Sequence, residues 1–191
     1  MTRPAARPVL ETAHASPTEE RTRARLEAMF AARDLAPWFH ARRLLIDEEE
    51  RISNCFRVDG EFLLRWRPFS DMETTRPRLD TSLLATYLHE QLHAYLGGQS
   101  GLDAALDEVR AWYPQVPDSE HGGARSDFST RLHLILCMLE LDSLAQFIGE
   151  EDARLHLSHA RGYRWIYREV LAHTKRLREL NRRHGLGVHP N

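Results

Sequence analysis

The amino-acid sequence predicts an α+β fold, a mostly helical single domain with a small three-stranded antiparallel sheet. Apolar residues recur at helical spacing along most of the 191 residues. Between residues 43 and 66 the pattern changes to a rough alternation of apolar and polar residues, which is typical of strands. We expect one domain over residues 16–185, after a flexible arm at 1–15 and before a short tail at 186–191, because the arm carries prolines and small residues without a period.

The first expected helix has a clear start signal. Ser16 is suited to the N-cap, Pro17 to the first helical position and Glu19 to the third, so the helix should run from here to about Asp34. Apolar repeats predict further helices over residues 80–96, 102–112, 126–149 and 163–183. The helix at 126–149 is apolar on almost every side, so we expect it in the middle of the fold.

Three short segments predict the sheet, namely 43–47, 52–58 and 61–66. Asp59 and Gly60 separate the last two segments, and this dipeptide favours the type I′ turn of a two-residue hairpin. The sequence therefore predicts an antiparallel hairpin within the sheet.

Composition argues against several classes of function. Acidic residues (28) nearly balance basic ones (26) for a net charge of −2, so there is no strong nucleic-acid signal. Cys55 and Cys137 are the two cysteines, without the dense spacing of a disulfide framework, which favours a reducing compartment. No apolar run is long enough for a membrane span or a secretory signal. We therefore expect a cytoplasmic protein.

The helix at 80–96 carries the sequence His89-Glu90-Gln91-Leu92-His93, which spells H-E-x-x-H. Two histidines four positions apart lie on one face of a helix, about 6 Å apart along its axis, so both imidazoles can reach one metal ion. Glu90 lies beside that face, where it can take a proton from a water molecule. The bare pattern arises by chance in about one in twenty chains of this composition. Its place on an amphipathic helix that ends at a glycine pair strengthens the metal-binding interpretation.

A catalytic zinc of this kind needs a third protein ligand and an open position for water. The apolar helix at 126–149 contains His133 and Glu140, which lie on one face about 10.5 Å apart along the axis, so we expect one of them to be the ligand. His133, near the helix start, is the favoured choice. Glu140 is the alternative and would otherwise orient a ligating histidine. His121, in the preceding loop, is a third candidate.

Other residues near these elements are weaker candidates. Tyr163 and Tyr167 lie at the start of the last helix, where a phenol can stabilise an oxyanion or simply pack. Cys137 shares a face with His133 and Glu140 and is expected to be a small buried core residue.

Through His89, Glu90 and His93 the chain resembles the zincin-type metallopeptidases. This resemblance implies that the two histidines bind Zn²⁺ and that Glu90 is the general base in peptide-bond hydrolysis, with a peptide or protein as substrate. His93-Ala94-Tyr95-Leu96, followed later by His121-Gly122, is faintly similar to the SprT/Spartan-like group, whose third ligand is a histidine. The gluzincin pattern would instead select Glu140.

Two alternatives remain open beside the zinc metallopeptidase. The chain could be a non-catalytic protein of zincin fold in which the metal is structural or regulatory. The motif could also be a chance match in a helical scaffold, which would place both histidines in solvent. A water-occupied fourth position on the metal would distinguish the first case from the peptidase.

Overall fold

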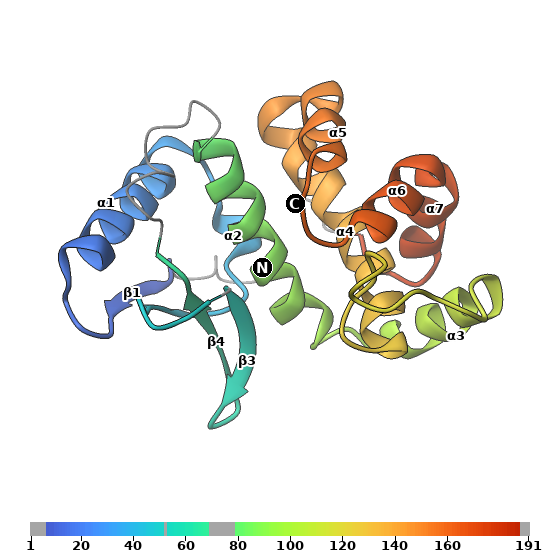
Figure 1. The fold of residues 1–191 in the computed structure, drawn as a ribbon, viewed down its shortest axis with the longest axis horizontal. Coiled ribbons are helices and arrows are strands. Elements are labelled where there is room, and N and C mark those ends of the chain that lie inside the picture. The colour runs from blue at the N-terminus through green and yellow to red at the C-terminus, as the bar shows by residue number, and fades with distance from the viewer. Residues whose placement is uncertain (1–6, 52, 69–78, 188–191) are drawn as a thin grey trace, which may run out of the picture. The chain divides into compact units, whose positions relative to one another are not determined.

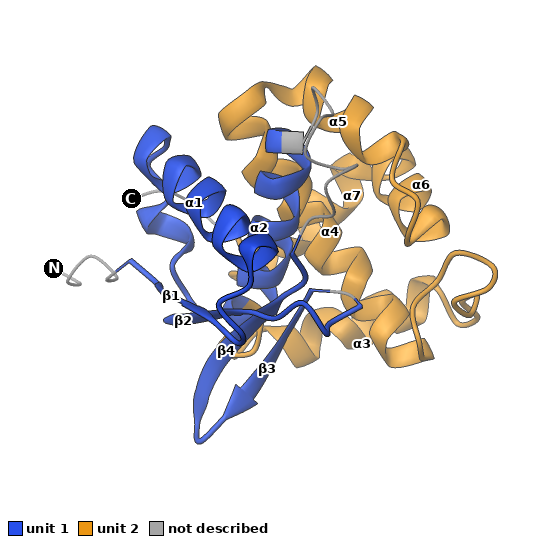
Figure 2. Ribbon diagram, turned by 60° about the vertical axis from the view of Figure 1, so that its left-hand side comes forward, with its two compact units in different colours: residues 1–95, 190–191 blue, residues 96–189 orange. Residues whose placement is uncertain are grey.

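The computed structural model describes residues 7–51, 53–68 and 79–187. The chain divides into two compact units, residues 1–95 with 190–191 and residues 96–189 (Figure 2). The sequence had indicated one domain over 16–185, whereas contacts within the chain group its residues into these two units. Among the helices of the described residues, none is both long and apolar enough to cross a lipid bilayer.

The first unit combines helices with a sheet (Figure 1). Its elements in chain order are β1 (Val9–Thr12), α1 (Pro17–Ala32), the short 3₁₀ helix η1 (Ala36–Trp38), β2 (Arg43–Ile46), β3 (Asn54–Val58), β4 (Glu61–Trp66) and α2 (Leu79–Leu96), of which α2 ends at the boundary with the second unit.

The sheet of the first unit is mixed, with the strand order β1-β2-β4-β3. β2 pairs in parallel with both β1 and β4, and only β3 and β4 are antiparallel. The predicted mixture of helices and a small sheet is confirmed, but the three-stranded antiparallel arrangement is wrong. The turn at Asp59 and Gly60 is as predicted, because both residues have positive φ values, 52° and 85°. This hairpin places β4, rather than β3, beside β2.

The fourth strand, β1, lies within the segment that the sequence analysis took for a flexible arm. Val9 is 59% exposed, so the strand lacks the buried alternation that would reveal it in the sequence. Its pairing with β2, in which Val9 lies opposite Arg43 and Thr12 opposite Ile46, defines the strand instead.

The core of the first unit lies between α1, the sheet and α2. Leu26 of α1 and Leu44 and Ile46 of β2 are fully buried. Phe30 of α1 meets Tyr87 of α2 edge to face, with ring centroids 5.1 Å apart. These contacts fix the orientation of α2 within its unit, and with it the face that carries the H-E-x-x-H motif.

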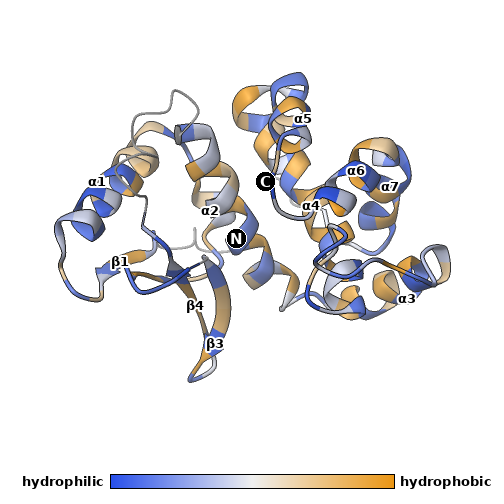
Figure 3. Cartoon of the chain, viewed as in Figure 1, coloured by the Kyte–Doolittle hydropathy of each residue, from blue (hydrophilic) through white to orange (hydrophobic). Residues whose placement is uncertain are grey.

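The second unit is helical and comprises α3 (Leu102–Trp112), α4 (Asp127–Ile148), α5 (Glu150–Ser158), α6 (Arg164–Ala172) and α7 (Thr174–Arg183). Helix α4 contacts all four of the others and is largely hydrophobic along its length, as Figure 3 shows. Helix α4 is therefore the central helix of this unit. Ser126 caps α4 by accepting a hydrogen bond from the Ser129 backbone N–H.

The single helix expected over 163–183 is wrong, because the structure divides it into α6 and α7 at His173. The Thr174 hydroxyl donates to the Val170 carbonyl, 2.8 Å away. Arg154 of α5 donates to the Leu171 carbonyl, also at 2.8 Å. These contacts satisfy backbone carbonyls at the end of α6, so the break leaves them with partners.

Candidate metal centre

The candidate metal ligands are divided between the two units. The H-E-x-x-H motif lies on α2 in the first unit, and the three candidates for a third ligand lie in the second unit.

His89 and His93 lie close together on α2. Their ring centroids are 5.1 Å apart with the planes at 73°, and a nitrogen of one lies within 4.8 Å of a nitrogen of the other. Two histidine ligands of a tetrahedral zinc are about 3.3 Å apart, at Zn–N bond lengths of about 2.0 Å. Small side-chain rotations are enough to bring both rings onto one ion, so this pair fits a metal. Sequence reasoning predicted this convergence.

The opposite face of α2 is attached to the chain that leads into β2. The backbone N–H groups of His40 and Ala41 both donate to Gln91 Oε1, at 2.8 and 2.7 Å. Gln91 Nε2 donates to the Tyr87 hydroxyl at 3.1 Å. Gln91, a variable position of the H-E-x-x-H pattern, therefore anchors the helix from behind the histidines. In the sequence, Gln91 is recognisable as a polar residue on an otherwise apolar face of the predicted helix.

Glu90 lies close enough to β3 to influence Cys55. Burial raises the pKa of the Cys55 thiol to about 12, and the charge of Glu90 raises it further in the same direction. Cys55 is therefore a neutral thiol at pH 7, unlike a cysteine prepared to bind metal. The interaction also places the carboxylate of Glu90 near β3, which is an edge strand of the sheet.

His40 is a partly buried histidine that sequence reasoning did not single out. Its ring packs against Tyr95 with centroids 5.0 Å apart, and burial lowers its pKa to about 4. The imidazole is therefore neutral at pH 7. It has no signal in the sequence, because its environment comes from the distant helix α2.

His133 is held by a carbonyl of its own helix. Its Nδ1 lies 2.7 Å from the Ser129 carbonyl oxygen. A carbonyl can only accept, so the ring hydrogen is on Nδ1 and the lone pair is on Nε2. Metal-binding histidines commonly have this arrangement, in which one nitrogen donates to a fixed oxygen and the other bears the lone pair. The ring of Tyr163 lies beside it, with centroids 4.4 Å apart.

Glu140 lies about two turns further along the same face of α4, beside Tyr167 and Cys137. The Tyr167 hydroxyl of α6 donates to Glu140 Oε2 at 3.0 Å. Burial raises the pKa values of both Tyr167 and Cys137 well above their usual ranges, and the charge of Glu140 adds to this. The phenol and the thiol therefore stay protonated and can donate to the carboxylate, which they hold in place.

His121, the third candidate, lies on the exposed loop between α3 and α4. Its Nδ1 is 2.7 Å from Asp118 Oδ1, and the His121 backbone N–H donates to the same oxygen at 3.1 Å. The ring of His121 is therefore tied to its own loop.

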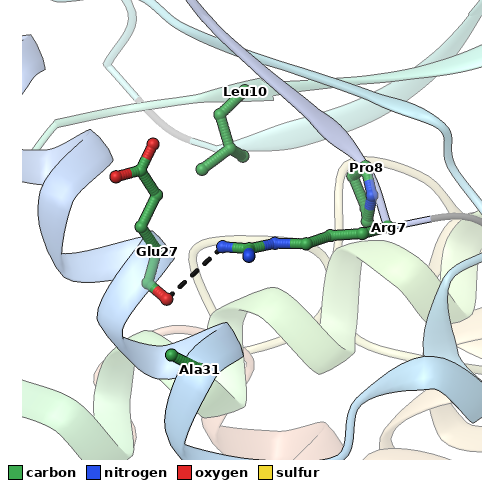
Figure 4. A pocket seen from close by; sticks show the side chains of 5 residues that line it. All are labelled: Arg7, Pro8, Leu10, Glu27 and Ala31. Carbon is green, nitrogen blue, oxygen red and sulfur yellow. Dashed lines mark hydrogen bonds between the residues drawn. The ribbon is translucent and has the colours of Figure 1, made fainter.

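The first unit also contains a hollow of about 450 Å³ between β1 and α1, shown in Figure 4. Arg7 extends across it and donates to the Glu27 carbonyl at 3.4 Å. The hollow is lined by Arg7, Pro8, Leu10, Glu27 and Ala31. None of these residues is a candidate metal ligand, so the hollow is separate from the H-E-x-x-H face.

Comparisons with known proteins found no protein family, no curated protein and no solved structure that matches this chain.

Proposed function

We propose that the chain is a zinc-dependent metallopeptidase in which His89 and His93 bind Zn²⁺. The observation that carries this proposal is the pair of imidazoles on α2, whose nitrogens lie within 4.8 Å of each other. Glu90 follows His89 directly in the sequence, as the H-E-x-x-H pattern requires. A helix that is anchored from its opposite face holds such a pair in one orientation, which lowers the cost of binding an ion.

The third ligand in this proposal is His133, with Glu140 as the alternative. The Ser129 carbonyl favours the tautomer of His133 that has its lone pair on Nε2, as a ligand requires. Glu140 already accepts a hydrogen bond from Tyr167, which suits a carboxylate that orients a ligand. His121 is the weakest of the three, because Asp118 engages its ring.

A zinc ion bound by these residues would act as a Lewis acid toward the scissile carbonyl and the attacking water. Glu90 accepts a proton from that water as its oxygen bonds to the carbonyl carbon. When the C–N bond breaks, Glu90 returns the proton to the leaving amine. Tyr163, beside His133, supplies a phenol that can donate to the developing oxyanion.

The substrate class follows from the strand beside Glu90. β3 is an edge strand, and an edge strand can pair with an extended peptide through main-chain hydrogen bonds. Glu90 is close enough to Cys55, a residue of β3, for its charge to raise the pKa of that thiol. We therefore expect an extended peptide or a flexible protein segment as the substrate.

Metal content tests the proposal directly. After dialysis into metal-free buffer, the purified chain should retain about one tightly bound zinc, measured by mass spectrometry. Glu90→Gln should keep the zinc and reduce peptide hydrolysis by about 10²- to 10⁴-fold, because it removes only the proton acceptor. Full zinc retention in a His89→Ala/His93→Ala double variant would rule out the proposal.

Three further variants identify the third ligand, namely His133→Ala, Glu140→Gln and His121→Ala. We expect the largest loss of zinc affinity in His133→Ala. The matched control is His159→Ala. Like His133, His159 has its Nδ1 close to the carbonyl oxygen four residues earlier, that of Leu155 at 2.8 Å, but His159 is exposed on the surface. This control should leave both metal and activity unchanged. Zinc bound without any peptide hydrolysis, on a range of unstructured peptides, would favour a structural or regulatory metal instead.

A further inference from the structure

The first unit contains a second cluster of metal-ligand side chains, apart from the α2 histidines. His14 lies in the loop between β1 and α1, and Asp47 and Glu49 lie in the loop between β2 and β3. His14 Nε2 is 3.5 Å from Asp47 Oδ1 and 3.9 Å from Glu49 Oε1. The ligand atoms of all three lie within 4.8 Å of one another. One imidazole nitrogen therefore faces two carboxylates from a different loop.

These separations exceed those of a hydrogen bond. Elsewhere in the chain, His121 Nδ1 is 2.7 Å from Asp118 Oδ1, an ordinary hydrogen-bonded pair. At metal–ligand bond lengths of about 2.1 Å, two ligands of a tetrahedral ion are about 3.4 Å apart. The distances around His14 are close to that value. His173 is also 3.5 Å from a carboxylate, that of Glu169, but it faces one carboxylate where His14 faces two.

A buried carboxylate holds both loops in place. Glu19, which is fully buried at the start of α1, accepts hydrogen bonds from the His14 and Ser16 backbone N–H groups on Oε2, at 2.9 and 3.3 Å. Its Oε1 accepts from the Glu48 backbone N–H at 3.0 Å. The backbones that carry the imidazole and the two carboxylates are therefore fixed to one group, which preorganises the cluster before any ion binds.

The charge of the second loop favours a cation. Residues 47–50 are four consecutive acids, Asp-Glu-Glu-Glu. Arg65 pairs with Glu50 at 2.7 Å and approaches Asp47 at 3.9 Å, and Arg51 follows the acids in the sequence. Two positive charges against four negative ones leave the loop with an excess of negative charge. A divalent cation would neutralise it.

We propose that His14, Asp47 and Glu49 bind a divalent cation of the first transition series, which links the β1–α1 loop to the β2–β3 loop. One imidazole and two carboxylates form a mixed nitrogen and oxygen ligand set that suits Zn²⁺ or Mn²⁺, with water in the remaining positions. This site does not depend on the metallopeptidase proposal, because it shares no residue with the α2 motif.

Calorimetric titration with Zn²⁺ tests the site in a His89→Ala/His93→Ala background, where the α2 pair cannot contribute. We expect one binding event per chain. His14→Ala should weaken Zn²⁺ binding by at least about ten-fold. Mutating a residue that only hydrogen-bonds to a metal ligand already lowers affinity by about that factor, and His14→Ala removes one of the three ligands themselves. His121→Ala, the control from a hydrogen-bonded His–Asp pair, should bind as before. Equal Zn²⁺ affinity with and without His14 would overturn the proposal and leave an ion pair as the role of His14.

A second readout avoids the double variant, which can be less stable than the natural chain. Mn²⁺ is paramagnetic and broadens the NMR signals of nuclei close to it. In the otherwise unchanged protein, added Mn²⁺ should broaden the amide signals of residues 14–16 and 47–50. Asp47→Asn should remove this effect, whereas Asp118→Asn should not. Absence of broadening at these residues, or broadening that persists in Asp47→Asn, would contradict the site.

Discussion

The two units of the chain bury their polar side chains in different ways. In the first unit, Gln91 and Glu19 accept hydrogen bonds from backbone N–H groups of distant loops, such as those of Ala41 and Glu48. In the second unit, the buried carboxylate of Glu140 accepts from a side chain, the Tyr167 hydroxyl, and buried Arg131 of α4 instead donates to the backbone carbonyls of Tyr113 and Pro114. The buried acceptors of the two units therefore differ in what they bind: Gln91 and Glu19 satisfy backbone N–H groups of loops, whereas Glu140 satisfies a side-chain hydroxyl.

This contrast predicts different costs for removing a buried polar group. A lost acceptor in the first unit leaves backbone N–H groups without partners, which costs the full desolvation penalty of each. A lost donor in the second unit leaves one carboxylate oxygen that can turn to another partner. Three substitutions test the contrast, in order of decreasing expected effect.

Gln91→Ala should have the largest effect. It removes the acceptor for the backbone N–H groups of His40 and Ala41, both of which lie at the entrance to β2. The Ala41 N–H then has no acceptor among the described residues, whereas the His40 N–H keeps the Trp38 carbonyl at 3.1 Å. The unsatisfied donor and the cavity left by the side chain should together cost about 3 kcal/mol of unfolding free energy. Urea denaturation followed by circular dichroism measures this loss.

Gln146→Ala is the matched control for this substitution. Gln146 is exposed, and its side-chain amide donates to the Asp142 carbonyl of its own helix at 3.4 Å. We expect a change within about 0.5 kcal/mol. If Gln91→Ala lowered the unfolding free energy no more than Gln146→Ala does, the hydrogen bonds from Gln91 to the chain before β2 would not stabilise the first unit.

Tyr167→Phe should have an intermediate effect. It removes the hydroxyl that donates to Glu140 at 3.0 Å and leaves the ring in place. A hydrogen bond to a charged acceptor contributes about 1.5–3 kcal/mol, so we expect a loss of about 2 kcal/mol. Tyr113→Phe is the control, because the Tyr113 hydroxyl is 3.5 Å from Glu169 in a partly buried pair. A loss in Tyr167→Phe above that of Gln91→Ala would reverse the proposed contrast.

How far the sequence predicts the structure depends on whether a feature is local. The start of α1 follows from Ser16 and Glu19, which form the expected capping box. The pairing of His89 with His93 follows from helical geometry alone. Both signals lie within a few residues of the feature they determine, so the sequence displays them directly.

Features that depend on distant partners could not be predicted in this way. β1 is a strand because β2 lies beside it, and the β3–β4 hairpin determines which of its strands meets β2. The break between α6 and α7 is accompanied by a contact from Arg154 of α5. Likewise His14 meets Asp47 only because two separate loops come together, and nothing in the sequence near either residue indicates the other.

Glu19→Gln should have the smallest effect of the three, and one that depends on pH. Burial alone would raise the pKa of Glu19, but hydrogen bonds from the backbone N–H groups of His14, Glu48 and Ser16 outweigh it and lower the pKa below 4.5. The charged form is therefore stabilised by folding. Its contribution is present above pH 4.5 and disappears as the pH falls through the lower pKa of the folded state. At pH 7 we expect Glu19→Gln to cost about 1–2 kcal/mol, because an amide offers one accepting oxygen instead of two.

The measurement is urea denaturation at several pH values between 7 and 3, in the presence of a chelator so that bound cations do not contribute. The difference between the natural chain and Glu19→Gln should shrink as the pH falls below 4.5. Glu20→Gln is the control, since Glu20 lies in the same first turn of α1 but is 38% exposed and pairs with Arg23 on the surface. A constant difference at all pH values would show that Glu19 acts through its shape and not through its charge.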